Sequence, residues 1–305
     1  MKNNPLPAYQ VFGLFVESEL SLPELIEGDF TPDVSIRFGD VKEQPDLPSV
    51  SGISYKSFED KFLLKVSGVA CFLVESGNRI IIDREEGGSD DEIRLFLLGS
   101  AFGALIHQRG ILPLHGSAIV MDNQALIFSG NSGAGKSTLA AGFLNRGFKL
   151  LADDVCVITL NKEGEPIAHP GYPQMKLWGD SLENLGHKPV NLKRIRGNIK
   201  KYALPIVTDF CNVPLPVKGI YIINAKTNGK INLKNLTGVA KFNAVNSNTY
   251  RLNFLNREGN SIAHFKHIEA ISKKCFVKRL ERPTKGFYIN RLIELIELDI
   301  RRNAR

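Results

Sequence analysis

Residues 130–137, which read GNSGAGKS, have the composition and spacing of a segment that binds the phosphates of a nucleotide. They fit the pattern G-x-x-x-x-G-K-[ST] at every fixed position, in which the glycines let successive backbone N–H groups converge on phosphate oxygens. In this pattern Lys136 reaches the β- and γ-phosphates, and the Ser137 hydroxyl is a ligand of Mg²⁺. The predicted nucleotide-binding residues are Gly130, Asn131, Ser132, Gly133, Ala134, Gly135, Lys136, Ser137 and Thr138.

The nucleotide is predicted to be ATP, bound together with Mg²⁺. A phosphate-binding loop alone does not separate ATPases, GTPases and kinases, since all of them carry one. GTP-binding proteins usually read guanine with Asn-Lys-x-Asp, and the nearest segment here, NAKTNG at residues 224–229, lacks the aspartate. An adenine nucleotide therefore fits better.

Two adjacent carboxylates, Asp153 and Asp154, end the β-type run LLADD shortly after the loop. Side chains of adjacent extended residues point to opposite sides, so one carboxylate could hold a metal while the other accepts a proton from an alcohol. Alternatively, one of them simply begins the turn into the next strand. His115 lies in the apolar segment LPLHGSAI, 15 residues before Gly130. A single histidine in such a strand is more often a core residue than a catalyst.

Three segments, taken in order and at their spacing, resemble the catalytic domain of the HPr kinase/phosphorylase family of bacterial protein serine kinases. They are LHGSAI at residues 114–119, GNSGAGKST at residues 130–138 and RGFKLLADD at residues 146–154. The resemblance is close over residues 112–160 and looser elsewhere. It implies an ATP-dependent serine kinase whose partner is a protein or peptide with an acceptor serine. Because the HPr kinases assemble, it also implies a homo-oligomer.

The resemblance further implies a role for each candidate residue. Lys136 and Ser137 would handle phosphate and Mg²⁺. Asp153 would be the base that activates the serine hydroxyl, and Asp154 would lie beside it as a metal ligand. His115 would lie near the transferring phosphate.

The chain departs from the HPr kinases after this region. Where they read roughly E-I-R-G-L-G, the segment RIRGNI at residues 194–199 has Arg194 in the glutamate position. The first 110 residues resemble the front of a looser group of HPr-kinase-like proteins, some of which phosphorylate a serine of a peptide such as a lasso peptide. Two alternatives therefore stay open. One is a nucleotide-gated binding protein with vestigial catalysis, and the other is a kinase of a small-molecule hydroxyl.

A basic stretch at residues 188–201 holds six basic residues and no acidic one. It is either a solvated face or a loop that closes over the triphosphate or engages an acidic substrate. We predict that Arg196 and Lys201 bind the nucleotide, and Lys176 is a further candidate. Trp178, the single tryptophan, is expected in the core rather than against adenine.

The elements that would position these residues predict an α/β fold with a phosphate-loop core of the HPr kinase type. The loop follows a predicted strand at residues 124–130 and opens a predicted helix at residues 136–146, with another strand at 148–153. Apolar β-type runs predict further strands at residues 216–224 and 274–282. The chain then finishes with an amphipathic helix within residues 286–305.

A smaller β-rich unit precedes this core. Short β-type runs separated by turn residues predict an antiparallel unit, followed by a linking helix over residues 92–110. We therefore expect a β-rich N-terminal domain at residues 1–110 and an HPr-kinase-like catalytic domain at residues 111–305.

The charge is divided in the same way. Residues 1–110 hold 10 Lys and Arg against 18 Asp and Glu, a balance of −8, and the remainder holds 29 against 14, a balance of +15. The basic part lacks a nucleic-acid recognition motif, so we expect no nucleic-acid partner. The chain has no apolar run of the roughly 18 to 20 residues that span a bilayer and no secretion signal, so we expect a cytoplasmic protein without a membrane partner.

Overall fold

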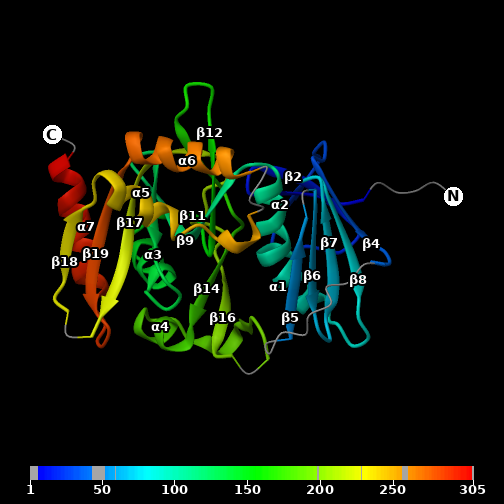
Figure 1. The fold of residues 1–305 in the computed structure, drawn as a ribbon. Helices are drawn as coiled ribbons and strands as arrows, with labels where there is room; N and C mark the ends of the chain where they lie inside the picture. The colour runs from blue at the N-terminus through cyan, green and yellow to red at the C-terminus, as the bar shows by residue number, and fades with distance from the viewer. Residues whose placement is uncertain are drawn as a thin grey trace. The chain divides into compact units, whose positions relative to one another are not determined.

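The computed structural model describes residues 6–42, 52–58, 60–197, 199–227, 229–255 and 260–303 (Figure 1). They form a mixed α/β fold with three sheets. The chain divides into two compact units, of which unit 1 comprises Met1–Pro113 and Thr249–His267. Unit 2 comprises Leu114–Asn248 and Ile268–Arg305. The segment Thr249–His267 therefore belongs with the N-terminal residues, although the sequence pattern contains no signal for this.

Unit 1 is built on a sheet of eight strands in the order β3-β1-β2-β4-β8-β7-β6-β5. Its strands are β1 (Ala8–Val11), β2 (Leu14–Ser18), β3 (Ile26–Gly28), β4 (Val34–Phe38), β5 (Ile53–Ser57), β6 (Lys61–Val66), β7 (Ala70–Glu75) and β8 (Arg79–Arg84). The expectation of a purely antiparallel unit is wrong at β4, which pairs in parallel with both β2 and β8. Alternation along a strand predicts which face is buried, but it does not predict the direction of the neighbouring strand.

The linking helix of unit 1 runs continuously through α1 (Asp90–Phe96), a π-helical turn (Leu97–Ala101) and α2 (Phe102–Gln108). The returning segment packs against it, because a Cβ at Gly103 would lie only 3.1 Å from the Tyr250 ring. In addition, the His107 Nε2 lies 2.9 Å from the Tyr250 carbonyl oxygen. These contacts explain why residues 249–267 join this unit.

The main sheet of unit 2 has the order β10-β9-β12-β13-β17-β19-β18, with β11 paired to β9 and β10 also paired to β17. Its strands are β9 (Leu112–Met121), β10 (Gln124–Ser129), β11 (Lys149–Ala152), β12 (Val155–Leu160), β13 (Pro166–His169), β17 (Leu215–Lys226), β18 (Asn232–Asn235) and β19 (Phe276–Pro283). Strands β10, β17 and β19 run parallel to one another. The loop at residues 130–137 thus leaves the carboxyl edge of a parallel part of the sheet.

A second, three-stranded sheet of unit 2 has the order β14-β16-β15 and is antiparallel. Its strands are β14 (Gln174–Trp178), β15 (Lys193–Arg194) and β16 (Lys201–Pro205). The remaining helices are α3 (Lys136–Leu144), α4 (Gly179–Asn184), α5 (Gly238–Asn246), α6 (Ser261–Lys274) and α7 (Ile289–Asn303), with 3₁₀ turns at Pro189–Asn191 and Leu252–Phe254. The predicted helices after the loop and at the end of the chain are confirmed as α3 and α7, whereas α5 and α6 were not predicted from the sequence.

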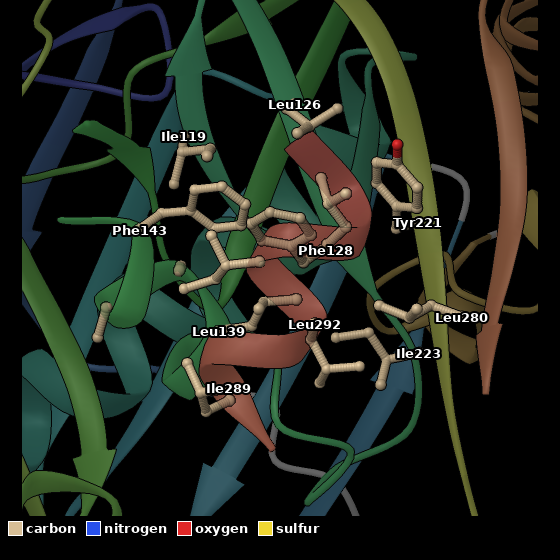
Figure 2. Close-up of a cluster of buried hydrophobic side chains, with 14 of the residues drawn as sticks. Ile119, Leu126, Phe128, Leu139, Phe143, Tyr221, Ile223, Leu280, Ile289 and Leu292 are labelled. Carbon is tan, nitrogen blue, oxygen red and sulfur yellow. The ribbon is translucent and has the colours of Figure 1, made fainter. Parts of the chain in front are cut away.

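A hydrophobic cluster packs α3 and α7 together against the main sheet (Figure 2). Phe128 of β10 stacks on Phe143 of α3 with ring centroids 5.4 Å apart. Gly142 lets α7 approach closely, since a Cβ there would lie 2.4 Å from the Cγ2 of Ile289. Tight packing of this kind fixes the position of α3, and its first turn carries Lys136 and Ser137. Among the described residues, no helix is both long and apolar enough to cross a membrane.

Candidate functional site

The glycine-rich loop connects β10 to α3 and depends on its glycines. Gly130 has a φ of 139°, and a Cβ there would lie 2.4 Å from the backbone oxygen of Ile223 in β17. Gly133 and Gly135 have φ values of 78° and 100°, which residues other than glycine rarely adopt. The loop therefore has a shape that this sequence permits and most substitutions would not. Helix α3 begins directly after it, so that its N-terminal N–H groups point toward the same space.

Lys136 lies over this loop and is 6% exposed. Its Nζ donates hydrogen bonds to the carbonyl oxygens of Gly130 and Asn131, each at 3.0 Å. Burial lowers the pKa of this lysine, while Asp154 and Asp153 act to raise it. To meet a phosphate, the ammonium group would exchange these carbonyl contacts for phosphate oxygens.

Arg282 of β19 supports the same loop from the other side. Its Nε donates to the Ala134 carbonyl oxygen at 2.9 Å, and its Nη2 lies 3.4 Å from the Gly133 oxygen. Sequence reasoning missed this residue because Arg282 lies in an ordinary strand pattern, 148 residues from Ala134. No local motif connects the two positions.

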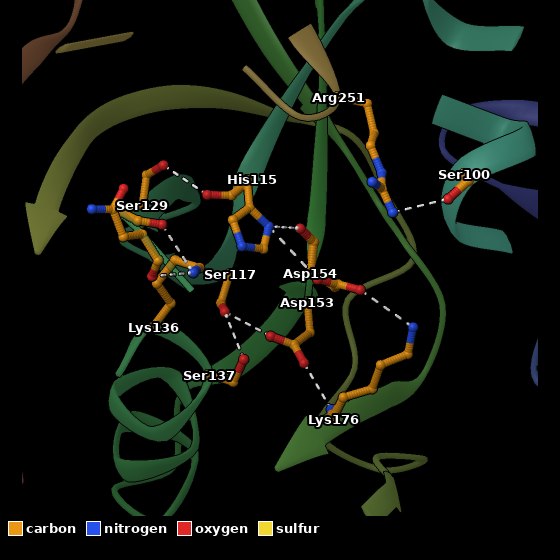
Figure 3. Close-up of polar contacts among 12 residues, drawn as sticks. Ser100, His115, Ser117, Ser129, Lys136, Ser137, Asp153, Asp154, Lys176 and Arg251 are labelled. Atoms are coloured by element: carbon orange, nitrogen blue, oxygen red, sulfur yellow. Dashed lines mark hydrogen bonds and ion pairs between the residues drawn. The ribbon is translucent and has the colours of Figure 1, made fainter. Parts of the chain in front are cut away.

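Asp153 is buried, and its side chain points toward Ser117 and Ser137 (Figure 3). Its Oδ1 accepts a hydrogen bond from the Ser117 hydroxyl at 2.6 Å, and its Oδ2 accepts one from the backbone N–H of Lys176 at 2.8 Å. The Ser117 hydroxyl also lies 3.5 Å from the hydroxyl of Ser137. Both carboxylate oxygens of Asp153 are thus engaged, next to the predicted metal ligand Ser137.

Asp154 lies with Asp153 in a bend between β11 and β12 and has a φ of 72°, so the expectation that the two are adjacent residues of an extended strand is wrong. Its Oδ2 lies 3.3 Å from the Lys176 Nζ, and its Oδ1 lies 3.6 Å from the His115 Nδ1 (Figure 3). Burial acts to raise the pKa of Asp154, but Lys176, Lys201 and His115 outweigh burial and lower the pKa to about 2. This carboxylate is therefore ionised at neutral pH.

His115 is held in one orientation at the start of β9. Its backbone oxygen accepts a hydrogen bond from the Ser129 hydroxyl at 2.7 Å, and its Nδ1 lies 3.0 Å from the backbone oxygen of Asp154. Because a carbonyl only accepts, we assign the ring proton to Nδ1. Burial and the charge of Lys136 lower the pKa of His115. The ring is therefore neutral at pH 7 and does not add a second positive charge beside Lys136.

Most of these groups line one cavity of about 340 Å³ within unit 2. The predicted site residues that line it are His115, Ser132, Gly133, Gly135, Lys136, Ser137, Thr138, Asp154 and Lys201, together with Lys176 and Trp178. Five predicted site residues are not part of the cavity lining, namely Gly130, Asn131, Ala134, Asp153 and Arg196, and Arg196 is half-buried in the turn before β16. Residues that sequence reasoning missed are Asp180, Ser181 and Asn184 of α4, Arg282 and Thr284, and the segment 286–289 that begins α7. Trp178 is 46% exposed, so the expectation that it lies in the core is wrong.

The oxygen atoms around Ser137 fit the needs of Mg²⁺. In the described parts of the chain, no group of three or more His, Cys, Asp or Glu residues could by itself hold a metal ion. Mg²⁺ does not require such a cage, because it usually keeps several waters and binds one or two protein oxygens plus substrate phosphates. Ser137 and one neighbouring carboxylate are sufficient for that mode of binding.

Comparisons with known proteins identify a structure and no sequence family. No family model matches this sequence, and no curated protein matches it. Among solved structures, the Hpr(Ser) kinase/phosphatase from Coxiella burnetii is similar to this chain, with a TM-score of 0.34 and 13% sequence identity. The match covers 63% of this chain and 97% of that chain. At this level the similarity does not assign an activity.

Proposed function

We propose that the protein is an ATP- and Mg²⁺-dependent kinase that transfers the γ-phosphoryl group to a serine hydroxyl of a protein or peptide. One observation carries this proposal. The lysine and serine of the glycine-rich loop line the same cavity as an ionised carboxylate, Asp154, and a neutral histidine, His115. Phosphoryl transfer to an alcohol needs cations on the phosphate side and a group on the alcohol side that orients the hydroxyl and takes its proton.

In this proposal the two aspartates exchange the roles that the family resemblance implies. Asp154 lines the cavity and accepts the hydroxyl proton. Asp153 is buried, with both of its oxygens in hydrogen bonds, and would hold Mg²⁺ together with Ser137. A carboxylate with a pKa of about 2 is a weak base. The transition state of phosphoryl transfer is loose, however, so the hydroxyl becomes acidic only as its bond to phosphorus forms. A proton acceptor such as Asp154 that remains ionised until that point is therefore sufficient.

Lys136 supplies positive charge for the phosphates. To contact them, its ammonium group would leave the loop carbonyls of Gly130 and Asn131. Ser137 and Asp153 are the residues that would hold Mg²⁺. When bound, the ion would neutralise charge on the β- and γ-phosphate oxygens. Arg282 lines the cavity and keeps the loop in the shape that receives the phosphates, since it donates to the loop carbonyls.

The test uses ATP labelled in its γ-phosphate and two peptide libraries, one with a central serine and one with alanine in its place. We expect label only in the serine library, and we expect Lys136→Met to abolish transfer. Lys149→Met is the matched control, because Lys149 is an exposed lysine of unit 2 outside the cavity lining. Wild-type protein that binds ATP without labelling any serine peptide would contradict the proposal and favour a nucleotide-gated binding protein. Transfer to small alcohols alone would favour a small-molecule kinase.

A further inference from the structure

We infer that one face of the small sheet β14-β16-β15 binds an acidic segment of the acceptor, next to the serine that is phosphorylated. That the bound peptide is the substrate rests on the proposed function. The face, called the lysine face below, consists of Lys176, Trp178, Lys193, Lys201 and Ala203.

Strand register places these residues on one side of the sheet. Lys176 of β14 and Lys193 of β15 are both paired with Ala203 of β16, and Trp178 is paired with Lys201. Directly paired residues on antiparallel strands project to the same side, and residues two apart along a strand share that side. Lys176 and Lys193 therefore stand on either side of a small alanine, roughly 10 Å apart across two strand spacings.

The opposite face of this sheet is part of the hydrophobic core. Met175 and Leu177 are 0% and 1% exposed, and Tyr202 and Leu204 pack against the same cluster. The cavity is lined mainly from the lysine face, with Leu177 as the lining residue from the opposite face. Three members of the lysine face, Lys176, Trp178 and Lys201, line the cavity directly, and Lys176 reaches Asp154.

Charge determines what this face can receive. The carboxylates in the cavity lining are Asp154 and Asp180, against four cations, namely Lys136, Lys176, Lys201 and Arg282. The basic stretch at residues 188–201 adds Lys193 on the same face and contains no acidic residue. A peptide that approaches Asp154 with its serine would place the neighbouring side chains over these lysines. Carboxylates there would be attracted, whereas cationic side chains would be repelled.

The spacing of the lysine face sets which positions of the peptide are read. An extended peptide advances about 3.3 Å per residue, so the roughly 10 Å between Lys176 and Lys193 corresponds to about three residues. We therefore place the preferred acidic residues within about three positions of the acceptor serine. An acidic segment farther from the serine would add little binding affinity, because interactions between surface charges are screened over about 8 Å at physiological salt.

Trp178 provides a binding signal that does not require catalysis. It is the single tryptophan of the chain, it is 46% exposed, and it lies on the lysine face. The probes are a serine peptide flanked on both sides by glutamates and the same peptide with glutamines instead. Titration of the full-length protein should give a saturable change in tryptophan fluorescence with the glutamate peptide. The affinity for that peptide should fall with added salt and exceed the affinity for the glutamine peptide.

Neighbouring residues of β15 supply the decisive comparison. Lys193→Met should weaken binding of the glutamate peptide about two- to fivefold, as expected for an exposed ion pair, and leave the glutamine peptide unaffected. Arg194→Met removes the same charge from the adjacent position, on the face opposite to Lys193, and should change neither affinity. Lys193→Glu should reverse the preference between the two peptides. Affinity for ATP should be unchanged in all three variants.

Equal affinity for both peptides, or equal losses in Lys193→Met and Arg194→Met, would overturn the inference. A loss of ATP affinity in Lys193→Met would also overturn it, because the lysine face would then serve the nucleotide. The proposed function fails separately from the inference. Salt-sensitive binding of the glutamate peptide without phosphate transfer to its serine would leave the docking face in place and reject the kinase.

Discussion

The replacement of Asp154 by asparagine tests the assignment of the hydroxyl-activating group. Asparagine keeps the shape of the side chain but removes its charge and its capacity to accept a proton. Loss of a positioned general base typically lowers the rate by a factor of about 10² to 10⁴. Nucleotide binding should persist, because the Lys136 Nζ and the loop backbone do not depend on Asp154 for their contacts with Gly130 and Asn131.

The same substitution has a stability cost that the structure allows to be estimated. The pKa of Asp154 lies at about 2 instead of 3.8, and each pKa unit corresponds to about 1.4 kcal/mol. The folded state therefore favours the ionised carboxylate by about 2 kcal/mol. Because the pKa is lowered on folding, this contribution is present above pH 3.8 and is lost as the pH falls through about 2. Asp154→Asn should thus be less stable than wild type at pH 7, and the difference should disappear in acid.

The assay is single-turnover transfer from labelled ATP at increasing Mg²⁺, with Asp153→Asn as the matched variant. Asparagine at position 153 would present an N–H₂ group to the donors from Ser117 or Lys176, at a cost of about 1–3 kcal/mol. Since Asp153 lies on the Ser137 side, higher Mg²⁺ should partly restore Asp153→Asn but not Asp154→Asn. The opposite pattern, rescue of Asp154→Asn alone, would refute the reasoning and return the role of base to Asp153.

Three further predictions concern the loop and unit 1. Gly130→Ala should weaken nucleotide binding and destabilise the fold by about 1–3 kcal/mol, because its Cβ would meet the Ile223 oxygen and its φ is positive; unchanged ATP affinity in a titration would contradict this. Arg282→Met should raise the KM for ATP roughly tenfold with a smaller effect on kcat, since it loosens the loop without removing a reacting group; steady-state kinetics with an unchanged KM would argue against it. Burial, His107 and His267 lower the pKa of His264 to about 4, so its stabilising effect is present above pH 6.5 and lost as the pH falls through about 4. After correction for the intrinsic pH dependence of amide exchange, the protection of amides in residues 249–267 should therefore fall as the pH decreases over that range, and less so in His264→Gln. Protection that does not change with pH would refute the effect.

Much of the fold could be predicted from local patterns. The strands on either side of the loop, helix α3 and helix α7 lie where apolar periodicity places them, with ends that differ by a few residues. The mixed pairing of β4 and the position of residues 249–267 could not be predicted. Both depend on contacts between segments far apart in the chain, and periodicity reports which face is buried rather than what covers it.

The sequence by itself predicted phosphate binding at the loop, because the residues on which that prediction rests are contiguous. Glycines at fixed intervals, then a lysine and a serine, specify a backbone that can surround phosphates wherever a strand leads into a helix. It also placed two adjacent carboxylates, Asp153 and Asp154, directly after the strand that follows the loop. Only the tertiary structure decided which of them enters the cavity, because that depends on the position of β14 and its Lys176. Packing likewise brought Arg282 to the loop and aligned Lys193 with Lys176, since strand register joins residues that no local spacing connects.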